Sequence, residues 1–200
     1  MLYLDDFTTG KEISLGHYTV SEKEIIDFAK DYDFQDFHTD PEAAKRSVFG
    51  GLIASGWHTA GICMKLICQA FMTQTACNGS PGIQDLKWLK PVRPGDTLTG
   101  FVRVTGQLPS KSKPDRGASL QHWALQNQDG DTVFCADVTV LMMRKPQPVE
   151  QAPAAAPTTT PAGQADAQPT SPDRAELEKW RAQAQSLWFN DGSCTGGKSE

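Results

Sequence analysis

One long apolar segment, from about Ile53 to Thr75, constrains the fold more than any other part of this sequence. Glycines in the run VFGGLIASGW interrupt the chain just before it. It is the only segment long enough to form a central helix, and a helix this apolar must be buried against another element. The sequence therefore predicts one buried helix together with a sheet that covers it.

The strands that could cover this helix lie on both sides of it. Lys11 to Val20 alternates as a strand does, and three or four β-like stretches follow the helix, over residues 82–90, 96–108, 118–128 and 132–145. Turn sequences separate them, at 94–96, 109–117 and 129–130. Strands joined in this order by short turns form an antiparallel sheet. We therefore predict an α+β fold in which a curved antiparallel sheet wraps around one helix.

Two shorter helices are predicted between the first strand and the apolar segment. Ser21 followed by Glu24 is a capping box, which opens a helix that runs to about Lys30. Asp40 and Pro41 start a second, short helix with the sequence DPEAAKRS. A loop rich in aspartate lies between these two helices.

The composition changes abruptly after Lys145, which divides the chain. Residues 1–145 form the predicted folded domain, and the 27 residues from Pro146 to Pro172 contain seven prolines and seven alanines. We expect a disordered Pro/Ala-rich linker over 146–171, an amphipathic helix over 172–189 and a disordered tail over 190–200. The apolar residues of that helix recur at helical spacing, so it should dock on its own domain, a second subunit or another protein; they are Leu177, Trp180, Ala184, Leu187 and Trp188.

Composition and charge exclude several classes of partner. Lys and Arg number 19 against 24 Asp and Glu, a formal net charge of −5, so no basic field is available to hold a nucleic acid. No segment approaches the roughly 20 apolar residues that cross a bilayer, and the start MLYLDDFTTGKE is acidic, unlike a signal peptide. The five cysteines form no C-x-x-C pair, which favours free thiols. We therefore expect a cytoplasmic protein without nucleic acid or membrane partners.

Asp33 and His38, in the run DFQDFH, are the candidate acid and base. On a non-helical loop this spacing lets a carboxylate and an imidazole converge on one water molecule, while Phe34 and Phe37 pack inward and fix the backbone. Histidine titrates near neutral pH, and a nearby carboxylate can orient it or share its work. The alternative is that Asp33 caps a turn and His38 packs as a hydrogen-bonded polar residue.

Glycines at the start of the long helix form a candidate anion site. Gly50, Gly51 and Gly56 bracket this start, where backbone N–H groups are unpaired and the helix dipole is positive. If the substrate is an acyl thioester, its oxygen gains negative charge during enolate formation, and such an N–H group stabilises that charge. The alternative is that these glycines serve only packing and turn geometry. His58, just inside the helix, is expected to have a capping or packing role.

The segment DFQDFHTDPEAAKRSVFGGLIASGWHTAG resembles the signature of the MaoC-like dehydratases and (R)-specific enoyl-CoA hydratases. The run DLKWLKPVRPGDTL is similar to the strand and turn that follow the central helix in that family, and the resemblance spans roughly residues 5 to 145. The resemblance implies a hot-dog fold, in which the sheet wraps around the helix. It also implies a homodimer or higher homo-oligomer with active sites at the subunit interface, which would cover an open sheet edge.

The resemblance also implies an activity, the reversible hydration of a trans-2-enoyl-CoA to the (3R)-3-hydroxyacyl-CoA. Asp33 and His38 would hold the water, and the Gly56 amide would bind the thioester oxygen, with no metal and no redox cofactor. Three residues depart from the family pattern, which commonly has Asn at Gln35, Pro at Asp36 and His at Ser55. The substrate-binding residues implied in the same segment are Gln35, Phe37 and Ser55.

Binding of CoA calls for cations near its phosphate groups. Lys111, Lys113 and Arg116, in PSKSKPDRG, form the densest basic cluster of the domain, on a predicted turn. The alternative is a solvated loop whose charges serve solubility. Lys90 and Arg93 are weaker candidates for the same contact.

Two other functions fit the same sequence. A hot-dog thioesterase shares the fold and the ligand, and it would release free thiol from acyl-CoA. A non-catalytic acyl-CoA binder or assembly subunit is suggested by the altered Gln35 and Asp36 and by the predicted C-terminal helix.

Overall fold

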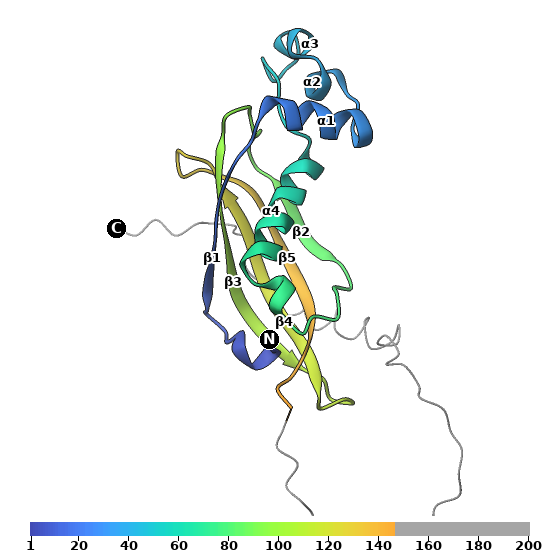
Figure 1. The fold of residues 1–200 in the computed structure, drawn as a ribbon, viewed down its shortest axis with the longest axis vertical. Helices are drawn as coiled ribbons and strands as arrows, with labels where there is room; N and C mark the ends of the chain where they lie inside the picture. Colours follow the sequence, from blue (N-terminus) through green and yellow to red (C-terminus); the bar gives the residue numbers. More distant parts are fainter. Residues whose placement is uncertain (147–200) are drawn as a thin grey trace, which may run out of the picture. The chain divides into compact units, whose positions relative to one another are not determined.

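A computed structural model describes residues 1–146, which form one five-stranded sheet with helices (Figure 1). Neighbouring strands all pair antiparallel, in the order β1-β3-β4-β5-β2. In chain order the elements are η1 (Leu4–Asp6), β1 (Glu12–Thr19), α1 (Glu22–Tyr32), α2 (Asp36–Thr39), α3 (Pro41–Lys45), α4 (Gly56–Ala70), η2 (Met72–Gln74), β2 (Ile83–Trp88), β3 (Thr97–Pro109), β4 (Arg116–Gln126) and β5 (Thr132–Met143).

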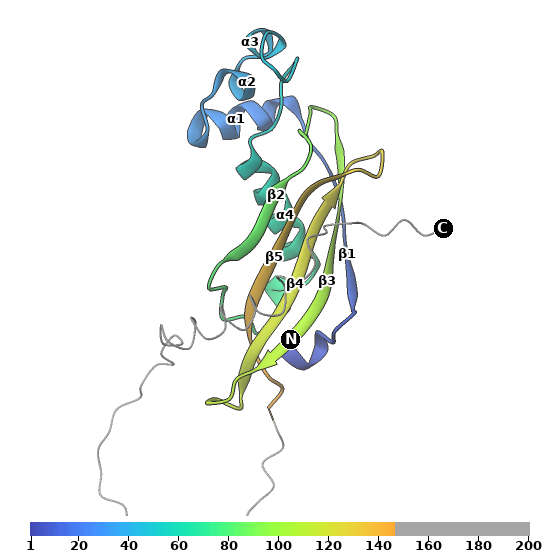
Figure 2. The same cartoon turned by 180° about the vertical axis from the view of Figure 1, so that it is seen from behind.

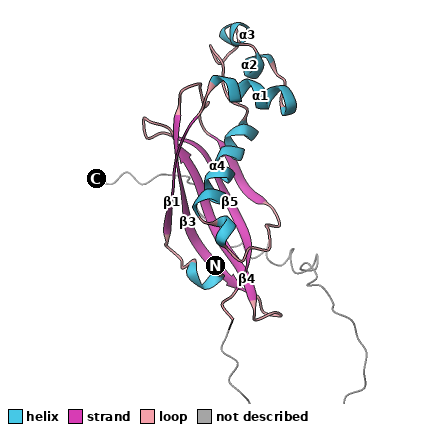
Figure 3. Ribbon diagram, viewed as in Figure 1, coloured by secondary structure: helices cyan, strands magenta, loops and turns pink. Residues whose placement is uncertain are grey.

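The long helix α4 lies against one face of the sheet, and the strands curve around it (Figures 1 and 2). The three helices α1, α2 and α3 gather at one end of the sheet, beyond the first turn of α4 (Figure 3). The predicted hot-dog fold is therefore confirmed.

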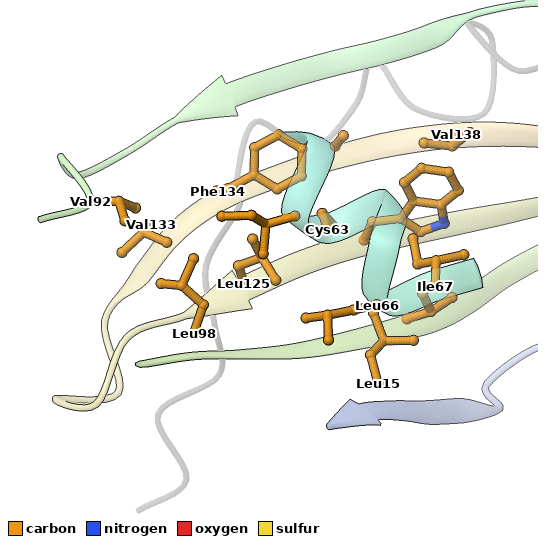
Figure 4. Close-up of a cluster of buried hydrophobic side chains, with 14 of the residues drawn as sticks. Leu15, Cys63, Leu66, Ile67, Val92, Leu98, Leu125, Val133, Phe134 and Val138 are labelled. Atoms are coloured by element: carbon orange, nitrogen blue, oxygen red, sulfur yellow. The ribbon is translucent and has the colours of Figure 1, made fainter. Parts of the chain in front are cut away.

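The core of the domain lies between α4 and the sheet. Thr59, Ile62, Cys63, Leu66 and Ile67 of α4 are buried, which is the spacing of a helix with one buried face. Figure 4 shows this face packing against strand residues, which include Leu15, Leu98, Leu125, Phe134 and Val138. Burial of each large apolar side chain contributes roughly 1.5–3 kcal/mol. The core thus fixes α4 on the sheet and, with it, the position of the first turn of α4.

Polar caps set where the helices around this end of the sheet begin. Ser21 and Glu24 form the predicted capping box at the start of α1. Asp40 caps α3, whose first turn contains Pro41, and Ser55 caps α4. Both short helices predicted from the sequence are therefore present.

The central helix is shorter than predicted at both ends. It begins at Gly56 rather than near Ile53, because the residues before it run extended: the Ile53 N–H donates to Phe37 O and the Ala54 N–H to Val92 O. It ends at Ala70, after which Phe71 leaves the helical region and the 3-10 turn η2 follows. These flanking residues are as apolar as the helix, so periodicity alone does not separate them from it.

The predicted conformation of the Asp33 to His38 segment is wrong in two respects. The segment is not a simple loop, because His38 lies on the helical turn α2. Phe37 is half-buried against the core, but Phe34 does not pack inward, since its exposed fraction is 78%. Only one of the two aromatic residues therefore holds the backbone of this segment in place.

The predicted linker at 146–171, helix at 172–189 and tail at 190–200 lie outside the described residues, apart from Pro146, and stay predictions. Within residues 1–146, no helix combines the length and the apolar character that crossing a membrane requires.

Candidate active site

Asp33 and His38 come together at the end of α1. Asp33 is the residue that ends α1, and His38 lies on α2, so the short turn between the two helices brings their side chains close. His38 Nε2 lies 3.4 Å from Asp33 Oδ2, and the imidazole is buried. The other ring nitrogen, Nδ1, is 2.8 Å from Ile53 O, and a carbonyl oxygen only accepts, so Nδ1 carries the hydrogen. Nε2 is therefore the nitrogen left to face Asp33.

Two side chains hold the carboxylate of Asp33. The Ser55 hydroxyl donates to Oδ2 at 2.7 Å, and the Gln35 amide nitrogen donates to Oδ1 at 2.7 Å. Burial raises the pKa of the Asp33 carboxyl, but the hydrogen bonds from Ser55 and Gln35 and the nearby His38 lower it further, so the pKa lies below its ordinary value. Asp33 is thus held as a carboxylate that accepts hydrogen bonds.

The N-terminus of α4 lies next to this pair. Ser55 caps the helix, because its Oγ accepts from the backbone N–H of Trp57 at 3.2 Å. Gly56 is the first helical residue, and among residues 1–146 its N–H has no acceptor. The indole N–H of Trp88 donates to Gly56 O at 2.8 Å. The site therefore offers one free backbone donor beside an imidazole and a carboxylate.

These groups border one cavity of about 450 Å³. Its polar lining comes from Asp33, His38, Thr59, Lys90 and the Gly56 backbone, and the rest is apolar and aromatic, with Phe37, Phe49, Ile53, Ala54, Trp57, Trp88, Leu89, Pro91 and Val92. A mostly apolar cavity with a few convergent polar groups is typical of a site for a small organic ligand. The arrangement suits a ligand with an apolar chain and one oxygen that gains charge.

The predicted site residues of the Asp33 to Gly56 segment fall into two groups. Asp33, Phe37, His38 and Gly56 line the cavity. The side chains of Gln35 and Ser55, both predicted to bind substrate, donate to the carboxylate of Asp33. Ser55 is fully buried behind the carboxylate, so its hydroxyl acts on the site through Asp33.

The predicted basic cluster is not brought to this cavity within one chain. Lys111, Lys113 and Arg116 lie at the turn between β3 and β4, at the end of the sheet opposite α1, α2 and α3 (Figure 1). Arg116 also forms an ion pair with Asp115, at 2.9 Å. Lys90, a weaker candidate, lines the cavity and pairs with Asp131 at 2.6 Å.

The segment 88–92 forms a wall of the cavity, and from the sequence only Lys90 of this segment is a candidate, as a phosphate contact. The run DLKWLKPV contains Trp88 and Leu89, and its resemblance to the family is the only sequence signal at this segment. That resemblance gives neither residue a role. Arg93, just after this segment, holds the neighbouring loop, because its guanidinium donates to Phe49 O at 2.6 Å. Phe49, which also lines the cavity, was missed as well.

His58 and Cys63, two other reactive side chains of the described residues, lie on α4 and are buried. His58 is buried and stacks on Phe28 with ring centroids 4.9 Å apart, which fits the expected packing role. Burial raises the pKa of the Cys63 thiol to about 12, so it is not a nucleophile. No cluster of three or more metal-ligating side chains occurs in residues 1–146.

Comparisons with known proteins place the chain in a family. Residues 6–122 match the family model described as MaoC like domain. The chain is 32% identical over 142 residues to the uncharacterized protein YdeM of Bacillus subtilis, covering 70% of this chain and 99% of that protein. It is 36% identical over 111 residues to an (R)-specific enoyl-CoA hydratase of Rhodospirillum rubrum, covering 54% of this chain and 74% of the hydratase. The crystal structure of a MaoC-like dehydratase from Rhodospirillum rubrum matches with 38% identity and a TM-score of 0.68, covering 74% of this chain and 100% of that one.

The chain therefore belongs to the MaoC-like dehydratase family, and it is homologous to an (R)-specific enoyl-CoA hydratase. Family membership supports hydratase or dehydratase activity in general.

Proposed function

We propose that this protein reversibly hydrates a trans-2-enoyl-CoA to the (3R)-3-hydroxyacyl-CoA. The observation that carries the proposal is the pairing of Asp33 Oδ2 with His38 Nε2 at 3.4 Å on the wall of an apolar cavity. The relationship to the (R)-specific enoyl-CoA hydratase of Rhodospirillum rubrum supports the same reaction.

The pair is suited to hold one water molecule. In the neutral form of His38, Nδ1 carries the hydrogen that it donates to Ile53 O, which leaves Nε2 as an acceptor, and the carboxylate of Asp33 is an acceptor as well. A water that donates one O–H to each of them turns a lone pair toward a carbon atom in the cavity. The water is thereby oriented and made more nucleophilic at the same time.

Hydration then proceeds with atoms and charge in balance. The water oxygen forms a bond to C3 as one of its protons passes to the Asp33 and His38 pair. The electrons of the 2,3 double bond move toward the thioester oxygen, and the Gly56 N–H stabilises the negative charge that develops there, an interaction worth roughly 3 kcal/mol for one well-placed donor. The pair returns one proton to C2, which regenerates the carboxylate and the neutral imidazole.

The thioester carrier is assigned to CoA on the basis of the charges near the cavity. Lys90 lines the cavity, and Arg93 lies close by, against the loop that carries Phe49. These two cations can meet phosphate groups at the mouth. A contact from Lys111, Lys113 or Arg116 would have to come from a second subunit, because in one chain they lie at the opposite end of the sheet.

A homodimer is part of the proposal. β2 is an edge strand of the sheet, and the apolar residues Ile83 and Trp88 at its two ends are exposed. Trp57 beside Trp88 is exposed as well. A second copy on this edge would cover these side chains and continue the sheet beyond β2.

The reaction is tested by following the loss of the conjugated double bond of crotonyl-CoA. Asp33→Asn and His38→Ala are each expected to lower kcat about 10²-fold to 10⁴-fold. Asp36→Asn is the matched control, because Asp36 is an exposed carboxylate of the same segment, whereas the carboxylate paired with His38 is that of Asp33. The control should keep the wild-type rate within about twofold.

Three outcomes contradict the assignment. Full activity of Asp33→Asn and His38→Ala means that the pair is not the catalytic centre. Release of free thiol with the double bond intact identifies a thioesterase instead. Tight binding of enoyl-CoA esters of every chain length without turnover identifies a non-catalytic binder.

A further inference from the structure

Trp88, on the edge strand β2, contacts the N-terminus of α4. It is the last residue of β2 and pairs with Phe134 of β5, so its backbone is part of the sheet. Its indole lines the cavity, and its N–H donates to Gly56 O at 2.8 Å. A rigid ring anchored on a strand therefore holds the first peptide group of α4.

The face of the same indole packs directly on Gly56. A Cβ atom built on Gly56 would lie 2.5 Å from Cε2 of Trp88 and 2.8 Å from its Cδ2 and Nε1. Real Cβ atoms do not approach other atoms this closely, so no residue but glycine fits against the ring as it stands. The requirement for glycine at the tip of α4 thus comes from Trp88 as well as from access to the backbone N–H.

A chain of hydrogen bonds leads from this indole to the carboxylate of Asp33. Trp88 donates to the C=O of Gly56, and the N–H of the same peptide group, which belongs to Trp57, donates to Ser55 Oγ at 3.2 Å. The Ser55 hydroxyl in turn donates to Asp33 Oδ2 at 2.7 Å. Consecutive hydrogen bonds of this kind polarise one another and hold their members in one geometry.

We propose that Trp88 is a positioning residue for the hydration reaction, fixing the free N–H of Gly56 and the carboxylate of Asp33 relative to each other. The inference rests on the proposed function and deepens it. The ring and its N–H group have separate roles. The ring sets the orientation of Gly56 by packing, and the N–H group starts the chain of hydrogen bonds that ends at Asp33.

The variant Trp88→Phe keeps a ring and removes the donor. Because both groups that it positions act on the transition state, kcat is expected to fall about tenfold while KM stays within about twofold. The acid limb of the kcat/KM profile should move to higher pH, because Ser55 is held less firmly against Asp33. Trp123→Phe is the matched control: it also removes an indole hydrogen bond, to Gln121 Oε1 at 2.9 Å, but in the core and away from the cavity. The control should lower Tm without changing kcat or the pH profile.

The packing role of the ring is tested by two substitutions, the second of which should relieve the effect of the first. Gly56→Ala is expected to lower kcat about 100-fold, because the new methyl group displaces the ring or the tip of α4. The double variant Gly56→Ala/Trp88→Leu should be more active than Gly56→Ala alone, because the clash is gone. Thermal unfolding gives a readout that needs no turnover: Gly56→Ala should lower Tm in the wild-type chain and less in Trp88→Leu.

The failure of this inference differs from the failure of the proposed function. If wild type is faster than Asp33→Asn on crotonyl-CoA but Trp88→Phe behaves as Trp123→Phe does, Trp88 has no positioning role. If the double variant is less active than Gly56→Ala, the packing argument is wrong. If wild type and Asp33→Asn have the same rate, both the proposed function and the role of Trp88 are overturned.

Discussion

Ser55 links two features of the site that are far apart in the sequence. Its Oγ accepts from the Trp57 N–H as the cap of α4, and its O–H donates to Asp33, 22 residues earlier in the chain. A hydroxyl can do both because it is donor and acceptor at once. The carboxylate of Asp33 is thereby tied to the positive end of the α4 dipole, which favours its charged form.

Substitution of Ser55 tests this link. In Ser55→Ala the hydrogen bond that lowers the pKa of Asp33 is lost, so that pKa rises and the acid limb of kcat/KM moves to higher pH. The unfolding free energy should fall by about 1 to 3 kcal/mol, from the lost cap and the lost bond to a charged group. Ser55→Thr retains the hydroxyl and is the control. Initial rates measured across the pH range give the position of the acid limb. An unchanged acid limb in Ser55→Ala would contradict the role given to Ser55.

The sequence predicted the residues that line the candidate site better than the side chains that support them. Asp33, His38 and Gly56 were predicted from residue type and from the resemblance, and all three line one cavity. The contacts of Gln35 and Ser55 to Asp33 were not predicted, because they depend on how α1 ends relative to the start of α4. Spacing along the chain carries no information on that distance.

At the scale of elements, strands and caps were easier to predict than the ends of the central helix. The alternating strands and the capping box at Ser21 have local signals, and each lies where it was expected. The start of α4 is harder to predict, because Leu52, Ile53 and Ala54 are buried in extended form and continue the apolar run of the helix. The cap at Ser55 decides the boundary, and its partner Trp57 is equally apolar.

The contact between α1 and α4 should make stability depend on pH. His58 of α4 stacks on Phe28 of α1, and its Nδ1 is the one buried side-chain nitrogen or oxygen in residues 1–146 without a hydrogen-bond partner. Burial lowers the pKa of His58. The negative charge of Glu24 raises this pKa, the positive charge of Lys65 lowers it, and burial is the largest of the three effects. The unfolded chain, with a pKa near the ordinary 6.5, therefore binds a proton at a higher pH than the folded protein. The stability contributed by the neutral ring is fully present above that value and is lost as the pH falls toward the folded pKa.

His58→Phe should remove this dependence, because phenylalanine can stack on Phe28 without taking up a proton. The fall of Tm on acidification should then be smaller than in wild type, by about 2 to 4 °C for each kcal/mol involved. Calorimetric scans at neutral and mildly acid pH measure the difference. His17→Phe, on β1, is the control and should retain the wild-type slope. Equal slopes for wild type and His58→Phe would show that His58 is not the acid-sensitive group.

At the scale of the whole molecule, residue type alone could not place the basic loop. Lys111, Lys113 and Arg116 are close together in sequence, and the sequence predicted their turn. The direction in which β3 and β4 run puts that turn at the end of the sheet away from the cavity. The resemblance implies CoA, a ligand whose phosphate groups call for cations. Only the topology shows which cations of one chain lie near the cavity.

The exposed edge of the sheet leads to a prediction on assembly. Ile83 of β2 is 49% exposed, and Trp57 of the adjoining α4 tip is 61% exposed. A second copy that pairs with β2 would bury these side chains and continue the sheet across the subunit interface. Ile83→Asp should weaken the dimer, raising its dissociation constant about 30-fold if the side chain is an interface hot spot worth about 2 kcal/mol. Val48→Asp makes the same kind of change, from an apolar to a charged side chain, at a residue that is 96% exposed on the loop before α4, and it should leave the dimer intact.

Sedimentation equilibrium measures the dissociation constants of both variants. The specific activity of Ile83→Asp should fall on dilution in parallel with the dimer fraction. A wild-type chain that is monomeric at every concentration would rule out the edge of β2 as the subunit interface.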